Sequence, residues 1–216
     1  NPLEGQIHTG AMMKSLIALA REHGVEYLTG ATVEEWDAQT DSITLMLSGQ
    51  SDRVRIQCDK LAICTNAFSN QLLPDLEIRP GRGIVLLTKE IPGLKFKGAF
   101  HYHQGYYYFR NVGTRVLFGG GRNLDFSAEE TLNFGINQKI FAHLESELHQ
   151  LILPGLDFEI DQWWSGIMAF GPDKRPLVGL HTPRVGYAVG LGGMGVALGS
   201  LVGDQLAKLI CFSEND

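Results

Sequence analysis

The stretch of sequence that decides the fold lies near the end of the chain and reads Gly186-Tyr-Ala-Val-Gly-Leu-Gly-Gly-Met-Gly-Val-Ala-Leu-Gly199. A short apolar strand at 187–189 runs into closely spaced glycines, and an apolar helical pattern with no early charge follows them. Glycines let the backbone adopt positive φ and approach a ligand closely, while a helix start offers unpaired N–H groups and the positive end of its dipole. The stretch predicts a strand, a tight turn and a helix, either as a plain connection in an α/β domain or as a seat for a flat cofactor with an electron-rich edge.

The residues just before this stretch carry a second set of motifs. Trp164 and Gly166 are followed by Gly171-Pro-Asp173 and by Pro176-Leu-Val-Gly179. Together with residues 190–196 they resemble the closing signature of the D-amino-acid oxidase superfamily, whose familiar members are glycine oxidase and sarcosine oxidase. In that family the glycine turn and the following helix start face the pyrimidine side of the FAD isoalloxazine, where negative charge collects on reduction. The resemblance implies that the cofactor is bound by Gly192, Gly193, Met194, Gly195 and Val196.

Three more motifs follow in the family's order and extend the resemblance over nearly the whole chain. Residues 5–33 are similar to the helix and strand that lead to the adenosine end of FAD, which implies that Val33 lies near the adenine. Residues 61–69, Leu-Ala-Ile-Cys-Thr-Asn-Ala-Phe-Ser, resemble a strand followed by A-T-G-A-W-S and imply that Thr65 and Asn66 lie near the flavin or its ribityl chain. Residues 79–88 resemble a strand that begins P-x-R-G-Q. Three positions depart from these patterns: Asn66 replaces glycine, Phe68 replaces tryptophan and Ile84 replaces glutamine.

The motif that binds the pyrophosphate of a dinucleotide is missing from its usual place. The chain begins Asn1-Pro-Leu-Glu-Gly-Gln6, and no G-x-G-x-x-G follows an N-terminal strand with an acidic residue some twenty positions on. In this family that unit precedes every motif found here, so we expect the chain to be the carboxy-terminal portion of a longer enzyme, inactive by itself and binding FAD weakly or not at all. In sarcosine oxidase a cysteine holds FAD covalently, but Gly166 stands at that place here, so we expect non-covalent FAD.

Composition excludes several classes of partner. A chain of 216 residues that is 44% hydrophobic can bury a substantial core. Its net charge of −6 argues against a nucleic-acid partner, and its apolar runs are shorter than the roughly 20 residues of a membrane span. Cys58 and Cys64 would stand roughly 20 Å apart on a straight strand, beyond the reach of a disulfide, which suggests a cytoplasmic location.

Hydrophobic periodicity predicts the elements. A helix is expected at 12–23 with Gly24 as its stop, and a buried strand at 25–28. Alternating segments predict strands at 32–36, 42–47, 53–57, 60–65, 83–88, 105–110 and 114–119, the first three as an antiparallel meander and the last two as a hairpin. Ser127 and Glu130 have the spacing of a capping box, and the helix after it carries an apolar stripe of Ile140, Leu144, Leu148 and Leu151.

These elements predict a mixed α/β and α+β fold with two lobes. Residues 1–71 and 162–216 are expected to form a partial FAD-binding lobe, an incomplete Rossmann-like unit made from both chain ends. Residues 72–161 are expected to form a substrate lobe with an antiparallel or mixed sheet.

The substrate site is the part on which the sequence departs most from the family. Amino-acid oxidases bind the substrate carboxylate through a bidentate arginine, because its planar fork matches two oxygens. Glycine oxidase has two such arginines, and the corresponding positions in this sequence are occupied by Met168 and Gly193. The positive charge would then have to come from Arg82, Arg110 or Arg122. The resemblance places Tyr106 and Arg110 on one strand at the substrate face of the flavin, although the tyrosines around them also fit plain sheet packing.

The resemblance implies that the full enzyme is an FAD-dependent oxidoreductase that oxidises a small amine or amino-acid-like molecule by hydride transfer. No catalytic side chain and no metal site are predicted, because the cofactor carries the redox step and His101 and His103 have no carboxylate or cysteine at a helpful spacing. Two alternatives remain: an FAD-dependent 2-hydroxy-acid dehydrogenase of the same fold, and a non-catalytic binding or assembly module that kept the fold. The partner is expected to be a small-molecule substrate, and the sequence does not indicate an oligomeric state.

Overall fold

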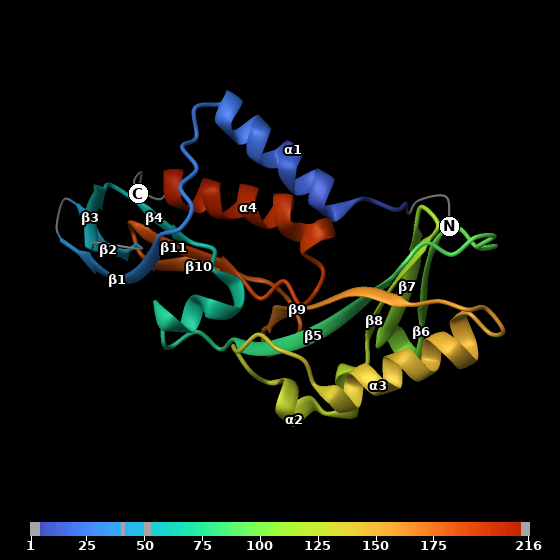
Figure 1. Ribbon diagram of the computed structural model, residues 1–216. Coiled ribbons are helices and arrows are strands. Elements are labelled where there is room, and N and C mark those ends of the chain that lie inside the picture. Colours follow the sequence, from blue (N-terminus) through green and yellow to red (C-terminus); the bar gives the residue numbers. More distant parts are fainter. Residues whose placement is uncertain (1–4, 40–41, 50–52, 213–216) are drawn as a thin grey trace. The chain divides into compact units, whose positions relative to one another are not determined.

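The computed structural model describes residues 5–39, 42–49 and 53–212 and has the predicted mixed α/β fold (Figure 1). The chain forms two compact units. Unit 1 consists of Asn1–Ile78 and Gly171–Asp216, and unit 2 consists of Arg79–Phe170.

Unit 1 contains two three-stranded sheets. The predicted meander is β1 (Thr32–Ala38), β2 (Ile43–Ser48) and β3 (Arg53–Cys58), which pair antiparallel in the order β1-β2-β3. The second sheet has the order β10-β11-β4 and consists of β4 (Leu61–Ile63), β10 (Leu177–Thr182) and β11 (Val185–Val189). β4 pairs parallel with β11, so segments from the first and last thirds of the chain share one sheet. Unit 1 also contains α1 (Thr9–Glu22), the 3-10 helix η1 (Asn66–Gln71) and α4 (Gly195–Phe212).

Helix α4 packs on the second sheet through one apolar stripe. Val202, Leu206 and Ile210 are buried against this sheet, together with Ala188 of β11. Gly186 permits the close approach, since a Cβ there would lie 2.7 Å from Leu206 Cδ1. By length and composition α4 alone among the described helices could cross a membrane, although its apolar run is interrupted by glycines and was expected to be too short for a span. Its buried stripe is the packing expected of a helix that covers a sheet.

Unit 2 is one antiparallel sheet in the order β6-β7-β8-β5-β9, with helices on one of its faces (Figure 1). Its strands are β5 (Arg79–Thr88), β6 (Ala99–Tyr102), β7 (Tyr107–Val112), β8 (Arg115–Gly120) and β9 (Ile160–Phe170). Its helical segments are η2 (His103–Gly105), η3 (Arg122–Leu124), α2 (Phe126–Glu129), α3 (Gln138–Glu147) and the π-helical turn η4 (Leu148–Ile152). The core lies between α3 and the sheet, where Leu144 and Leu148 pack with Ile84, Leu86 and Phe118.

The opposite face of this sheet carries several residues without side chains. Alternation along β5 places Gly81 and Gly83 on the face away from Ile84 and Leu86. Cross-strand pairing places further residues on that side, since directly opposed residues share a face. We call this surface the glycine face and define it by Gly81, Gly83, Gly119, Gly166 and Met168.

Three local predictions were wrong because the backbone forms other hydrogen bonds than expected. Residues 25–28 form no strand, since Val25 N donates to Ala20 O of the preceding helix and Leu28 is 70% exposed. Ser127 is not a helix cap: Asp125 accepts from Ala128 N, and α2 begins before Ser127. Leu151 leaves the apolar stripe because the π-helical turn shifts it outward, and it is 57% exposed.

The compact units also divide the chain at other residues than the expected lobes. The division falls at 78/79 and 170/171 instead of 71/72 and 161/162. Leu73 packs with Ile43, Ile63 and Val185 and so belongs to unit 1. β9 pairs with β5 from Thr88↔Ile160 to Arg79↔Phe170 and so belongs to unit 2. The turn residues 40–41 and 50–52 of the meander lie outside the described residues.

Candidate cofactor and substrate sites

The glycine turn after β11 has the backbone that the sequence predicts. Gly190, Gly192 and Gly193 have φ of 81°, 54° and 84°, a region that residues with a Cβ rarely adopt. Met194 N donates to Leu191 O over 2.7 Å, and α4 begins at Gly195. The turn therefore connects the end of a strand directly to the start of an 18-residue helix.

Asn66 joins the second predicted cofactor motif to this turn. Its side-chain Oδ1 accepts hydrogen bonds from Gly190 N at 3.0 Å and Leu191 N at 3.4 Å. Its own φ is 50°, a left-handed conformation that asparagine tolerates better than most residues, which explains why it can replace glycine here. Thr65 precedes it and shares a hydrogen bond of 3.0 Å with Ser69. The predicted cofactor residues at 65–66 and the start of the glycine turn are therefore neighbours.

The turn presents unpaired N–H groups and the positive end of a helix dipole, which together suit an electron-rich group. A helix cannot satisfy its own first N–H groups, and here these belong to Gly195 and Val196. The first turn of α4 carries no acidic residue, so no carboxylate competes for its positive end. Met194 and Val196 are exposed. Val33 lies on β1 in the other sheet, and its placement near the adenine stays a prediction.

The predicted substrate residue Arg82 is engaged in an ion pair on the helix-covered face. Its Nε and Nη2 donate to the two carboxylate oxygens of Glu129, each at a distance of 2.9 Å. Its Nη1 donates to Asn133 O. Glu129 is fully buried, and its hydrogen bond raises the pKa of the Arg82 guanidinium. Sequence reasoning could not separate this arginine from those on the opposite face, because strand alternation becomes informative only once the helices are placed.

Tyr106 and Arg110 do not stand on one straight strand as expected. Arg110 lies in β7, but Tyr106 precedes that strand and caps η2. His103, Gln104 and Gly105 have positive φ, so the chain turns sharply before β7 begins, and His103 does not share a strand face with His101. Tyr106 packs edge-on against Phe126, with 6.0 Å between ring centroids. Met168 lies opposite Gly81 in β9.

From the sequence, Arg122 was only one of three arginines that could supply a positive charge. The structure gives it the most distinctive surroundings of the three. It follows three consecutive glycines at the end of β8, and its guanidinium carbon lies 4.5 Å from the ring centroid of Phe170 and 5.1 Å from that of Phe126. A Cβ on Gly81 would come within 2.8 Å of that carbon, so the guanidinium rests on the glycine face. The run Gly119-Gly-Gly-Arg122 was the available signal.

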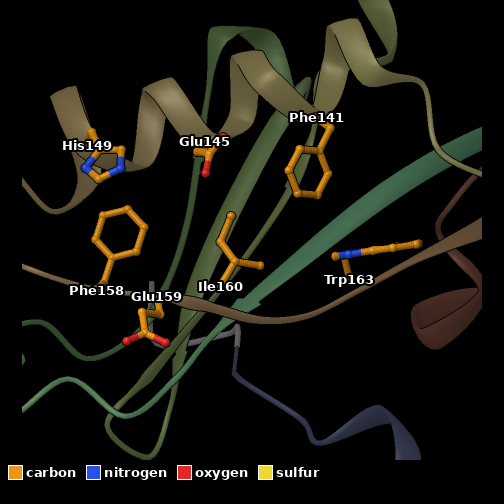
Figure 2. Close-up of a pocket in the computed structure, with 7 residues that line it drawn as sticks. All are labelled: Phe141, Glu145, His149, Phe158, Glu159, Ile160 and Trp163. Atoms are coloured by element: carbon orange, nitrogen blue, oxygen red, sulfur yellow. The ribbon is translucent and has the colours of Figure 1, made fainter.

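A surface pocket of unit 2 lies away from these residues (Figure 2). It has a volume of about 440 Å³ and lies between α3 with η4 on one side and the start of β9 on the other. Its lining consists of Phe141, Glu145, His149, Phe158, Glu159, Ile160 and Trp163. Phe141 and Trp163 meet edge-on within it, which places the pocket on the helix-covered side of the sheet. Across the described residues, no group of three or more His, Cys, Asp or Glu side chains could bind a metal ion.

Comparisons with known proteins agree with these features. The family model for FAD dependent oxidoreductases, called DAO, matches residues 1–209. The bifunctional protein ThiO/ThiG of Nostoc sp. is 25% identical over 220 residues, which cover 100% of this chain and 32% of that protein. The monomeric sarcosine oxidase of Bacillus sp. is 26% identical over 228 residues, which cover 96% of this chain and 57% of that protein.

Solved structures show the same fold. L-proline dehydrogenase from P. horikoshii superimposes with a TM-score of 0.74 at 19% identity, over 92% of this chain and 54% of that one. Glycine oxidase from Bacillus cereus superimposes with a TM-score of 0.72 at 16% identity, over 91% of this chain and 54% of that one. The chain spans about a third to just over half of the length of these relatives. Because the family model matches nearly every residue, the chain belongs to the DAO family of FAD dependent oxidoreductases.

Proposed function

We propose that the full-length protein oxidises a small amine or amino-acid-like substrate and binds FAD without a covalent link. The observation that carries this proposal is the glycine turn, which has three positive φ values and leads into the N-terminus of α4. Asn66 accepts a hydrogen bond from the first glycine of this turn. The proposed cofactor residues are Val33, Thr65, Asn66, Gly192, Gly193, Met194, Gly195 and Val196. Bound FAD would supply the redox chemistry, with the hydride leaving the substrate carbon for the flavin.

The residues of this chain would orient the cofactor and the substrate. The N–H groups of Gly195 and Val196 and the dipole of α4 would favour negative charge on a flavin edge bound in front of them. On the glycine face, Gly166 has open space where a Cβ would stand, which suits close contact with a flat molecule, whereas Phe170 and Arg122 already pack over Gly81. The cysteines Cys58, Cys64 and Cys211 are free thiols, and we place the protein in the cytoplasm on this basis.

The glycine turn can be tested with a pair of valine variants that match in backbone conformation. Gly193 has a φ of 84° and Gly24, at the end of α1, has a φ of 82°. In the full-length protein Gly193→Val and Gly24→Val therefore impose similar backbone strain, but only the first alters the proposed cofactor site. We expect Gly193→Val to lose most of its flavin and its turnover, while Gly24→Val keeps both. Equal flavin content in the two variants would remove the turn from the cofactor site.

The substrate class is tested by comparing oxygen consumption and dye reduction with amines, amino acids and 2-hydroxy acids. We expect turnover with amines or amino acids. Turnover confined to 2-hydroxy acids would favour the dehydrogenase alternative, and a flavin-free full-length protein would favour a non-catalytic module.

A further inference from the structure

The pocket of unit 2 in Figure 2 has a pair of aromatic rings at each of its two ends. At one end the ring of His149 lies against that of Phe158, with 4.4 Å between the centroids. At the other end Phe141 meets Trp163 edge-on, with 6.4 Å between the centroids. In each pair one ring comes from α3 or η4, and the other comes from β9 or the residues just before it. The space of about 440 Å³ that they border is large enough for a small molecule.

Trp163 leaves much of its apolar surface uncovered at this place. Cross-strand pairing with Leu86 puts Trp163 on the helix-covered face of the sheet, and strand alternation puts Trp164 on the opposite face. Trp163 is nevertheless 55% exposed, although tryptophan is highly buried on average. Because Trp163 lines the pocket, a ligand there would cover apolar surface that the chain itself leaves in water.

Glu145 brings a negative charge between the two ring pairs. It lies four residues from both Phe141 and His149, and all three line the pocket from the helical side. Figure 2 shows its carboxylate pointing from the helix toward the strand side of the pocket. Within the part of the chain that the structure describes, this carboxylate has no hydrogen bond and no ion pair. The other carboxylate of the pocket, that of Glu159, pairs with Lys89 Nζ at 2.5 Å, so the charge of Glu145 remains unbalanced.

Aromatic faces and an unpaired carboxylate together select a cation with an apolar body. The face of an aromatic ring attracts a cation, most strongly for tryptophan, and a carboxylate supplies the counter-charge. A neutral apolar ligand would cover the carboxylate without giving it a partner, which is costly, and an anion would be repelled by it. A metal ion would lack ligands, since the described residues contain no group of three His, Cys, Asp or Glu side chains suited to one.

We propose that this pocket binds a small organic ammonium ion from solution, with its alkyl groups against Trp163 and Phe158 and its charge facing Glu145. The site lies on the helix-covered face of the sheet, opposite the glycine face. It goes beyond the proposed function, because it requires neither the glycine turn nor a hydride transfer.

The test titrates the flavin-loaded full-length protein with choline and, separately, with the neutral alcohol in which a tert-butyl group replaces the trimethylammonium group. Choline has no nitrogen lone pair, so amine oxidation cannot consume it. Sodium chloride keeps the ionic strength constant, and the solution is held at about pH 8, where histidine side chains are ordinarily neutral. The indole N–H resonance of Trp163 is assigned by its loss in Trp163→Leu. We expect choline to shift this resonance at a concentration about 10-fold below that required of the neutral alcohol.

Two matched pairs of variants locate the site, with choline affinity measured by calorimetry. Glu145→Gln and Glu130→Gln remove the same charge, but Glu130 is an exposed residue at the end of α2, outside the pocket. We expect Glu145→Gln to weaken choline binding by about 2- to 5-fold and Glu130→Gln to leave it unchanged. Trp163→Leu should weaken binding by about 3- to 30-fold, whereas Trp164→Leu removes the same ring from the opposite face and should not.

Equal affinity for choline and the neutral alcohol would overturn the proposal, and so would a Trp163 resonance that choline does not move. Equal losses of affinity in Trp163→Leu and Trp164→Leu would also place the ion elsewhere. If Trp163→Leu fails to fold, Glu145→Gln decides, because the exposed Glu145 side chain contributes no hydrogen bond or ion pair to the described fold. A choline affinity of Glu145→Gln equal to that of Glu130→Gln would then refute the site.

Discussion

At the residue scale, Asn66 combines a strained backbone with two hydrogen bonds that hold the glycine turn. We predict that Asn66→Gly keeps the backbone conformation but frees Gly190 N and Leu191 N, each bond being worth about 0.5–1.5 kcal/mol. Hydrogen exchange at these two amides should accelerate, and the full-length protein should hold flavin less tightly. Asn111→Gly is the matched control, because the Asn111 side chain accepts from Gly98 N in unit 2. Unchanged exchange at Gly190 would show that the turn holds its shape without Asn66.

A second residue-scale prediction concerns the Arg82–Glu129 pair. Glu129 is fully buried, and Asn137 Nδ2 also donates to it over 3.0 Å. Glu129→Gln should therefore destabilise the fold by about 3 kcal/mol, because it leaves a largely buried guanidinium without its counter-charge. The double variant Arg82→Met with Glu129→Leu should be more stable than Glu129→Gln in thermal or urea unfolding. A role of Arg82 in substrate binding would appear instead as a raised KM for a stable Arg82→Met protein.

At the scale of elements, α3 is held to the sheet by a short stripe of leucines. Leu144 is fully buried against the core of unit 2, whereas Leu151, in the π-helical turn that follows, is mostly exposed. We predict that Leu144→Ala costs about 2–5 kcal/mol of unfolding free energy, since it removes buried methyl groups and leaves a cavity. Leu151→Ala should change stability by less than about 0.5 kcal/mol. Equal losses in the two variants would mean that the helix does not pack as described.

At the scale of the whole molecule, the two units supply different parts of the proposed reaction. Unit 1 carries the glycine turn, and unit 2 carries the glycine face. We predict that the 216-residue chain by itself retains little FAD through gel filtration, because its sequence has no G-x-G-x-x-G motif to place a helix N-terminus against the pyrophosphate. Absorbance near the flavin band, measured per mole of protein, checks this. A stoichiometric yellow complex would contradict it.

The sequence by itself determined the elements whose signals are local. The meander, the helix that ends just before Gly24 and the strand, turn and helix at 185–212 follow from alternation, periodicity and glycine spacing, each readable within a few residues. The family was predicted for the same reason, since its motifs are short and keep their order along the chain. The strand expected at 25–28 failed because pairing requires a second strand, which local sequence does not reveal.

Only the tertiary structure decided which charged residues share a surface. Arg82 and Arg110 are both arginines on strands of one sheet, yet Arg82 lies on the helix-covered face with Glu129. Arg122 instead packs on Phe170 and over Gly81, which are distant from it along the chain. Side-chain contacts of this kind arise from sheet register and helix placement. The sequence therefore determined the family and the glycine turn, and the packing of unit 2 decided which of its arginines is paired and which rests on aromatic rings.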